Sequence, residues 1–262
     1  MVKTGSYMPQ NAKIQGALFD LGDTIFNFGK LNTSEIFHKA SRLSYNYLKQ
    51  LHQPAGQLWW YRLRNLTAIR IRNLFSNVTG NDFDSLQVLK KIGKKQGYRL
   101  TEQQYRQLHW LWFKPLADTG NTEPDIARTF KKLKQMQLRL GILSNTSINA
   151  DSLERLLREL KILKFFDAAV YSYQFKFRKP NPRIFKIAAE SLLLQPEHII
   201  YVGDRIDTDI KPALKAGMFA ALKNAYTNDS KTLPQGAHKI STLSKLPGLI
   251  SRINEETTDA KT

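Results

Sequence analysis

Short apolar segments that alternate with amphipathic helices constrain the fold of this chain more than any other feature. Apolar runs at 14–19, 138–143, 168–171, 198–202 and 219–222 have the length and content of buried strands. Helical periodicity is found between and after the later runs, at 124–136, 150–163, 182–194 and 210–216. This alternation predicts an α/β fold, in which a parallel sheet carries helices on both faces. The run at 219–222 is expected to be the last core strand, and the chain after about Glu255 to be irregular.

A helical insertion separates the first apolar run from the others. Helical patterns at 34–51, 57–75, 83–95 and 102–113 are separated by short turns, which is typical of a small helical bundle. The chain is therefore predicted to form an α/β core from residues 1–28 and 119–262 and an inserted helical cap from residues 29–118.

Composition and charge narrow the classes of protein. No apolar run approaches the roughly 20 residues of a membrane helix, and the absence of cysteine excludes disulfides and thiolate metal sites. The first residues are polar and do not resemble a signal peptide, so a cytoplasmic protein without a membrane partner is expected. The net charge of +18, of which +10 falls within 29–118, indicates anionic partners. The sequence does not define the oligomeric state.

Polar residues follow four of the predicted strands at the point where each strand ends. The first strand ends in the segment FDLGDT, which contains Asp20, Gly22 and Asp23, and the second is followed by Ser144 and Asn145. Lys179 follows the third strand, and the fourth is followed by an acidic segment with Asp204, Asp207 and Asp209. Because the carboxyl ends of parallel strands share one edge, these side chains are expected to converge in one cleft.

The residue types in this cleft are those that phosphoryl transfer requires. A hydroxyl and backbone N–H groups at a helix start bind anions, and a lysine adds positive charge. Several carboxylates suit Mg²⁺, and one remaining carboxylate can act as a nucleophile. Each segment alone is also ordinary turn or helix-cap chemistry, but the combination favours a catalytic site.

With these four segments in this order, the chain resembles the haloacid dehalogenase-like (HAD) superfamily of hydrolases, in particular its C1-capped phosphatases. The resemblance covers the core from Asp20 to about Gly217 and implies a Rossmann-like sheet with a helical cap. It implies that Asp20 is the nucleophile, which becomes an aspartyl phosphate. It also implies that Ser144 and Asn145 bind the phosphoryl group and that Lys179 binds it and stabilises charge.

The resemblance also implies a Mg²⁺ cofactor and a small phosphorylated substrate. The metal ligands would be Asp20, the backbone carbonyl of Gly22, Asp204 and Asp209, with Asp207 as a weaker candidate. Nucleotides, sugar phosphates and acyl phosphates all remain open as substrates. Nucleic acid remains open as a partner of the basic cap but is not favoured.

One position departs from the family pattern. Most family phosphatases carry a second aspartate, the general acid and base, two residues after the nucleophile, where this chain has Gly22. Three hypotheses follow. Asp23, shifted by one position, substitutes for it; or the enzyme prefers leaving groups that need no proton, such as acyl phosphates; or the site binds phosphorylated ligands with little turnover. The first two, which keep a working phosphatase, are favoured over a catalytically weak binding protein.

Other chemistries of the same family are ranked lower. The dehalogenases need no metal, so the acidic segment 203–209 argues against them. Phosphonate hydrolysis uses a cap lysine, for which Lys30 and Lys39 are candidates. In the cap, Trp59, Trp60 and Tyr61 precede a series of arginines, which suggests a nucleic-acid surface, but the arginines are scattered around the helix. The aromatic side chains are expected to form bundle core.

Overall fold

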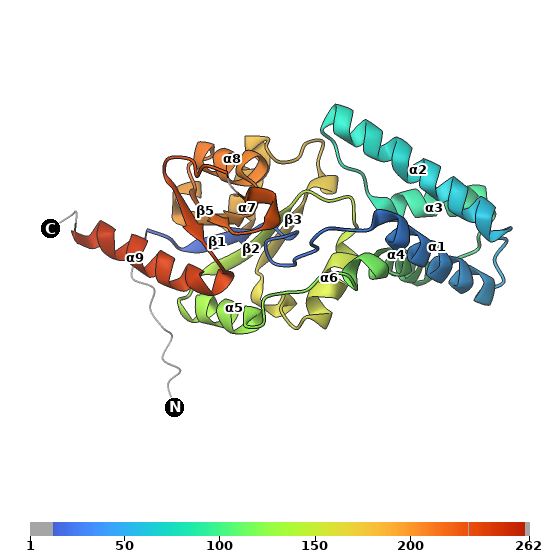
Figure 1. Ribbon diagram of the computed structural model, residues 1–262, viewed down its shortest axis with the longest axis horizontal. Coiled ribbons are helices and arrows are strands. Elements are labelled where there is room, and N and C mark those ends of the chain that lie inside the picture. Colours follow the sequence, from blue (N-terminus) through green and yellow to red (C-terminus); the bar gives the residue numbers. More distant parts are fainter. Residues whose placement is uncertain (1–12, 230, 260–262) are drawn as a thin grey trace.

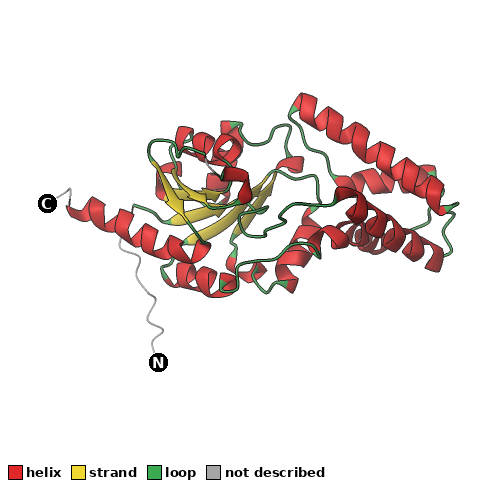
Figure 2. Cartoon of the chain, in the orientation of Figure 1, coloured by secondary structure: helices red, strands yellow, loops and turns green. Residues whose placement is uncertain are grey.

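The computed structural model, which describes residues 13–229 and 231–259, contains the predicted parallel α/β sheet (Figures 1 and 2). The six strands lie in the order β3-β2-β1-β4-β5-β6, and every neighbouring pair is parallel. Their bounds are Gly16–Phe19 (β1), Arg139–Ser144 (β2), Ala168–Tyr171 (β3), Ile199–Gly203 (β4), Phe219–Lys223 (β5) and Ala237–Ile240 (β6).

Strand β1 shows why the strands are apolar throughout. Its side chains alternate between two separate cores: Ala17 and Phe19 belong to one, and Leu18 belongs to the other. All three residues are fully buried, because helices cover both faces of the sheet. The burial of both faces removes the alternation of apolar and polar residues that a half-exposed strand would show.

The core helices form where the sequence predicts them. They are α5 (Ile126–Gln135), α6 (Ala150–Glu159), α7 (Pro182–Ser191) and α8 (Lys211–Lys215), the last preceded by a wide turn at Ile206–Ile210. Two expectations for the C-terminal region are wrong. Strand β5 is not the last core strand, because β6 follows it. The chain is not irregular directly after Glu255, because helix α9 (Leu246–Asp259), which buries Leu246, Leu249, Ile250 and Ile253 in the core, continues past that residue. The edge strand β6 has the polar sequence AHKI, so it lacks the apolar run of the other strands.

The inserted helices lie to one side of the sheet (Figure 1). They are α1 (Thr33–Gln50), α2 (Leu58–Thr79), α3 (Ser85–Lys95) and α4 (Glu102–Ala117), and both α2 and α4 extend four residues beyond their predicted ends. The two connections to the core run side by side, because the backbones of Asn27 and Asn121 exchange hydrogen bonds of 2.7 and 3.0 Å. We propose cap boundaries at residues 29 and 118, next to this paired neck.

The expected burial of the α2 aromatic side chains is wrong for two of the three. Tyr61 is buried and donates a hydrogen bond to Ser44 Oγ, but Trp59 and Trp60 stack on one another and are more than half exposed. The periodicity predicted that all three lie on a helix, but it did not show which side of that helix packs inward. Trp59 and Trp60 lie on the outer side of the bundle.

Within the described residues, no helix combines the length and apolar content that crossing a bilayer requires.

His109 of α4 connects the cap to the core. Its two ring nitrogens lie 2.6 Å from Ser85 Oγ of the cap and 2.6 Å from Ser152 Oγ of helix α6. Ser85 also donates to the backbone oxygen of Ser147, in the loop that follows β2. Burial lowers the pKa of His109 to about 4, against the opposing charge of Asp84. The imidazole is therefore neutral at neutral pH.

This pKa predicts that acid weakens the folded protein through His109. Because the unfolded chain takes up a proton near pH 6.5 and the folded chain only near pH 4, the contribution is complete above pH 6.5 and is lost as the pH falls. We expect a loss of about 2 kcal/mol between pH 7 and pH 5. Urea unfolding at both pH values should show it, and His109→Gln should remove that part of the pH dependence. His38→Gln, at an exposed position, serves as the control. Equal pH dependence in wild type and His109→Gln would contradict the assignment.

Candidate active site

The sheet register brings the predicted site residues to one edge. Phe19 of β1 pairs with Ile142 of β2 and with Val202 of β4, so Asp20 lies one residue, and Ser144 and Asp204 two residues, beyond this level at one edge of the sheet. The chain places β2 and β3 on one side of β1 and returns to place β4 on the other. This is the switch point at which open α/β sheets form ligand sites.

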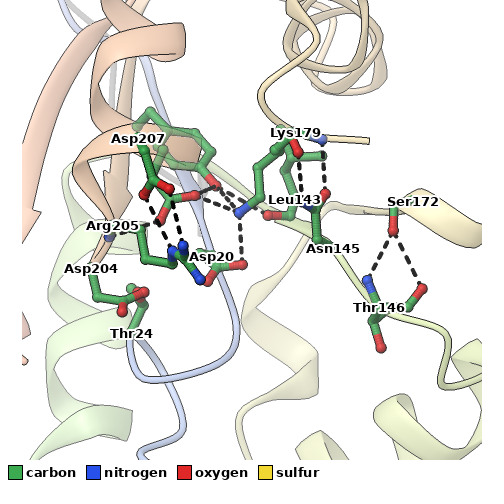
Figure 3. Close-up of polar contacts among 12 residues, drawn as sticks. Asp20, Thr24, Leu143, Asn145, Thr146, Ser172, Lys179, Asp204, Arg205 and Asp207 are labelled. Carbon is green, nitrogen blue, oxygen red and sulfur yellow. Dashed lines mark hydrogen bonds and ion pairs between the residues drawn. The ribbon is translucent and has the colours of Figure 1, made fainter. Parts of the chain in front are cut away.

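Lys179 lies at the centre of the cluster (Figure 3). Its Nζ donates hydrogen bonds to Asp20 Oδ1 at 2.9 Å, Asp209 Oδ1 at 2.6 Å and the hydroxyl of Tyr201 at 2.8 Å. Burial alone would lower the pKa of Lys179, but the neighbouring charges of Asp20 and Asp209 outweigh it and raise the pKa. Lys179 is therefore a fully charged, buried ammonium group.

Three carboxylates surround a space next to this lysine. Oxygen atoms of Asp20, Asp204 and Asp209 lie within 4.8 Å of one another. Gly203 permits this spacing, because a Cβ at that position would stand 2.5 Å from the Cβ of Asp209. The backbone N–H of Arg205 donates to Asp209 Oδ2 at 3.0 Å and fixes the carboxylate. Hard oxygen donors at this separation fit a divalent cation.

The pKa of Asp204 indicates how unfavourable the negative charge is in the absence of a cation. Burial and the charge of Asp20 raise it to about 7, although a hydrogen bond from Thr227 lowers it. Thr24 Oγ1 also donates to Asp204 Oδ1, at 3.3 Å, and Asn228 donates to its backbone oxygen at 2.8 Å. A divalent cation would relieve this repulsion, which is a second reason why these residues fit a metal.

Ser144 and Asn145 play different structural parts at this strand edge. Ser144 ends β2 and is buried. Both polar atoms of the Asn145 side chain contact the backbone of Lys179: Nδ2 donates to its oxygen and Oδ1 accepts from its N–H, each at 2.8 Å (Figure 3). Asn145 thus ties the end of β2 to the segment that carries the lysine.

Asp23 lies outside the carboxylate cluster. Its backbone has a φ of +55°, and Oδ1 accepts from the N–H groups of Phe28 (2.9 Å) and Gly29 (3.3 Å). The hydroxyl of Tyr226 donates to Oδ2 at 3.3 Å. In this conformation the Asp23 carboxylate holds the connection between core and cap.

Asp207, the weaker metal candidate, lies apart from the other carboxylates, and some of the residues that support the site were missed from the sequence. Asp207 is exposed and pairs with Arg205 at 3.0 Å, outside the group formed by Asp20, Asp204 and Asp209. Tyr201 was overlooked because it lies inside an apolar strand, yet burial raises its pKa well above the ordinary value and keeps its hydroxyl protonated. Thr24 is a supporting residue that could have been predicted, because it belongs to the same FDLGDT segment as Asp20.

A cavity of about 350 Å³ lies between the cap helices and the loop after β2. Its lining is mostly apolar and includes Ile36 and Phe37 of α1, Ile69 of α2 and Trp112 of α4. Ser147 and Ile148 close it on the core side, three and four residues after Ser144. One wall of the cavity is therefore formed by the loop that leaves β2 at the strand edge where the carboxylates lie.

A parallel α/β core with a lysine and three carboxylates at its switch point defines a class of hydrolytic enzymes. Comparison with protein families agrees: the model for the haloacid dehalogenase-like hydrolases matches residues 14–217. The chain belongs to this family.

Known relatives are similar over most of the chain. The glyceraldehyde 3-phosphate phosphatase of Methanocaldococcus jannaschii is 29% identical over 247 residues, which cover 93% of this chain and 100% of the relative. The enzyme of the same name from Methanopyrus kandleri is 31% identical, over 78% of this chain and 82% of the relative. Among solved structures, a HAD phosphatase from Thermococcus onnurineus shares the fold with a TM-score of 0.55 and 22% identity, over 90% of this chain and 98% of that one.

Proposed function

We propose that this protein is a Mg²⁺-dependent phosphatase that hydrolyses small phosphorylated substrates through an aspartyl phosphate on Asp20. The observation that carries the proposal is the buried contact of Lys179 Nζ with Asp20 and Asp209, at 2.9 and 2.6 Å, beside Asp204. The names of the relatives support the reaction class, since two of them are glyceraldehyde 3-phosphate phosphatases.

In the proposed reaction an oxygen of Asp20 attacks phosphorus, and the bond from phosphorus to the leaving oxygen breaks with its electron pair on that oxygen. Water then attacks the phosphorus of the aspartyl phosphate, which releases inorganic phosphate and restores Asp20. Lys179 neutralises charge on the phosphoryl oxygens and orients Asp20, while Ser144 binds the phosphoryl group. Asn145 holds the backbone of Lys179 in register.

Mg²⁺ would be held by Asp20, Asp204, Asp209 and the Gly22 carbonyl and would supply charge neutralisation to the transferred group. The chain would bind Mg²⁺ best when Asp204 is ionised, because a carboxylate must lose its proton to bind a metal and the pKa of Asp204 is about 7.

The leaving group is the point at which this site differs from its family pattern. Gly22 offers no proton, and the Asp23 carboxylate is engaged by Phe28, Gly29 and Tyr226. We infer that the enzyme favours leaving groups that depart without protonation, such as the carboxylate of an acyl phosphate. The apolar cavity in the cap supports a substrate whose leaving group carries an apolar part.

The phosphonate reaction finds no support in the cap lysines. Lys39 is exposed and forms an ion pair with Glu35 at 2.6 Å, and Lys30 is also exposed. Neither residue lines the cavity. A lysine that forms an imine needs a protected position at which its pKa is lowered.

Acetyl phosphate and benzoyl phosphate form a matched pair that tests this proposal. Both should be hydrolysed with Mg²⁺ and not after its removal by a chelator. The KM of benzoyl phosphate should be at least about tenfold lower, because burial of an apolar side group of this size contributes roughly 1.5–3 kcal/mol. Ile69→Asn, in the cavity wall, should reduce that ratio without changing acetyl phosphate turnover. Turnover that survives chelation would refute the metal dependence, and equal KM values would refute the apolar substrate.

A further inference from the structure

Helix α2 carries most of the exposed apolar surface of the molecule. Among the residues that the structure describes, eleven large apolar side chains are markedly exposed, and seven of them belong to α2. They include Trp59 and Trp60 near its start and Ile71, Leu74, Phe75 and Val78 near its end, with 65%, 64% and 77% exposure for the last three. So many exposed apolar side chains on one helix mark an interaction site more often than singly scattered ones do.

The helix is inverted relative to an ordinary surface helix. At 3.6 residues per turn, the exposed apolar side chains fall within about half of the circumference, which we call the outer face of α2. The opposite half carries Tyr61, Asn65, Ile69 and Ser76; Asn65 and Ser76 are polar and buried, and Tyr61 is buried in the cap core. A helix that served only the cap core would turn its apolar side inward.

Polar contacts fix this orientation. Tyr61 donates to Ser44 Oγ at 2.9 Å, and Ser76 donates to Asp82 Oδ1 at 2.8 Å. Arg64 donates to Gln96 Oε1 at 2.6 Å and to the hydroxyl of Tyr98 at 3.2 Å. Rotation of α2 to bury its apolar side chains would break all of these contacts, so the outer face remains available to a partner.

Charge restricts the partner. Residues 58–79 contain four arginines and no acidic residue, and the segment 29–118 as a whole carries +10. Arg70 is exposed next to the apolar side chains of the outer face. The partner must therefore present apolar groups and negative charge together.

We propose that the outer face of α2 docks on a lipid bilayer that contains anionic lipids. Such a surface offers phosphate groups to the exposed Arg70 and acyl chains to Leu74, Phe75 and Val78, and tryptophan is favoured at the boundary between them. The helix would lie in the plane of the membrane. A second copy of this chain fits less well, because Arg70, near the middle of α2, would face its own counterpart in an antiparallel pair. Nucleic acid would leave the aliphatic side chains in water.

Sedimentation with vesicles tests the proposal on the full-length protein. Wild type should bind vesicles of phosphatidylcholine mixed with phosphatidylglycerol and should bind pure phosphatidylcholine at least tenfold more weakly. The double variant Leu74→Glu and Phe75→Glu should reduce binding to the mixed vesicles at least tenfold. Leu193→Glu is the matched control, because Leu193 is 80% exposed but lies on the core, and it should bind as wild type does. Both variants change exposed positions, so thermal unfolding should stay close to that of wild type.

Three results would overturn the proposal. The first is wild type that stays in the supernatant with the mixed vesicles. The second is a Leu193→Glu variant that loses as much binding as the double variant. The third is a wild-type dimer in light scattering that becomes a monomer in the double variant without any vesicle binding, which would make the outer face of α2 a contact between two copies of the chain.

Discussion

Replacement of Asp20 by asparagine is expected to reduce turnover of acetyl phosphate by roughly 10⁴-fold or more, because the proposed nucleophile is lost while the shape of the side chain is kept. The backbone N–H of Asp20 donates to Val202 O at 2.9 Å, and asparagine retains that bond. Lys179 keeps its contact with Asp209 at 2.6 Å. The variant should therefore fold, and circular dichroism and thermal unfolding should verify this.

A second measurement separates a nucleophile from a residue that only binds metal. Acid quenching of wild type during turnover should yield protein whose mass has increased by one phosphoryl group, located on the peptide that contains Asp20. The Asp20→Asn variant should show no such species. Asp207→Asn is the matched control, because Asp207 is exposed and paired with Arg205, and its turnover should change less than twofold. Phosphate on a different residue, or more than a tenth of wild-type activity in Asp20→Asn, would rule out the assignment.

The sequence contained enough to predict the core of the site because that core follows from topology. Asp20, Ser144, Lys179 and Asp204 each follow a predicted strand, and parallel strands bring such positions to one edge regardless of side-chain detail. The register confirms that convergence. The roles of these residues in the reaction stay predictions until they are measured.

Contacts that depend on side-chain direction could not be predicted in this way. Tyr201 is one residue of an apolar strand, and only its packing brings its hydroxyl to Lys179 Nζ at 2.8 Å. Asn145 was predicted from its position after β2, but its two contacts with the backbone of Lys179 depend on a segment 34 residues away. Periodicity likewise identified α2 as a helix without identifying which side packs inward, so the exposed Trp59 and Trp60 were assigned to the core.

No membrane partner was expected from the sequence because it shows no spanning segment, and the structure agrees that no described helix spans a bilayer. The proposed docking of α2 is a different mode of contact, in which the helix would lie on the bilayer surface. The cavity lies on the inner side of the same helix, since Asn65, Ile69 and Asn73 line it. If both proposals hold, the substrate would be a phosphorylated compound with an apolar part, taken up close to a membrane surface.

Gly22→Asp is expected to create a proton donor at the position where most family phosphatases carry their general acid. The change should raise kcat/KM for butyl phosphate by roughly 10²–10⁴-fold, the usual contribution of general acid–base catalysis. A Cβ at Gly22 would stand 3.5 Å from the ring of Phe28, which is ordinary contact, so the first atom of the new side chain fits without a clash. Butoxide is a strong base that departs slowly without a proton, whereas acetate departs readily, so kcat/KM for acetyl phosphate should change little. This parameter reports formation of the aspartyl phosphate and excludes its later hydrolysis.

Two further variants make the test specific. Gly22→Asn has nearly the same shape but no acidic proton, so it should not accelerate butyl phosphate hydrolysis. Asp23→Asn, in the wild-type background, should leave kcat/KM for butyl phosphate within about tenfold, because Asp23 contacts Phe28, Gly29 and Tyr226 outside the carboxylate cluster. If Asp23→Asn instead removed the activity toward butyl phosphate, the shifted aspartate would already be the proton donor, and Gly22→Asp would add nothing. A gain of equal size on both substrates would mean that the new carboxylate improves metal or phosphate binding, and the inferred preference for leaving groups that need no proton would be wrong.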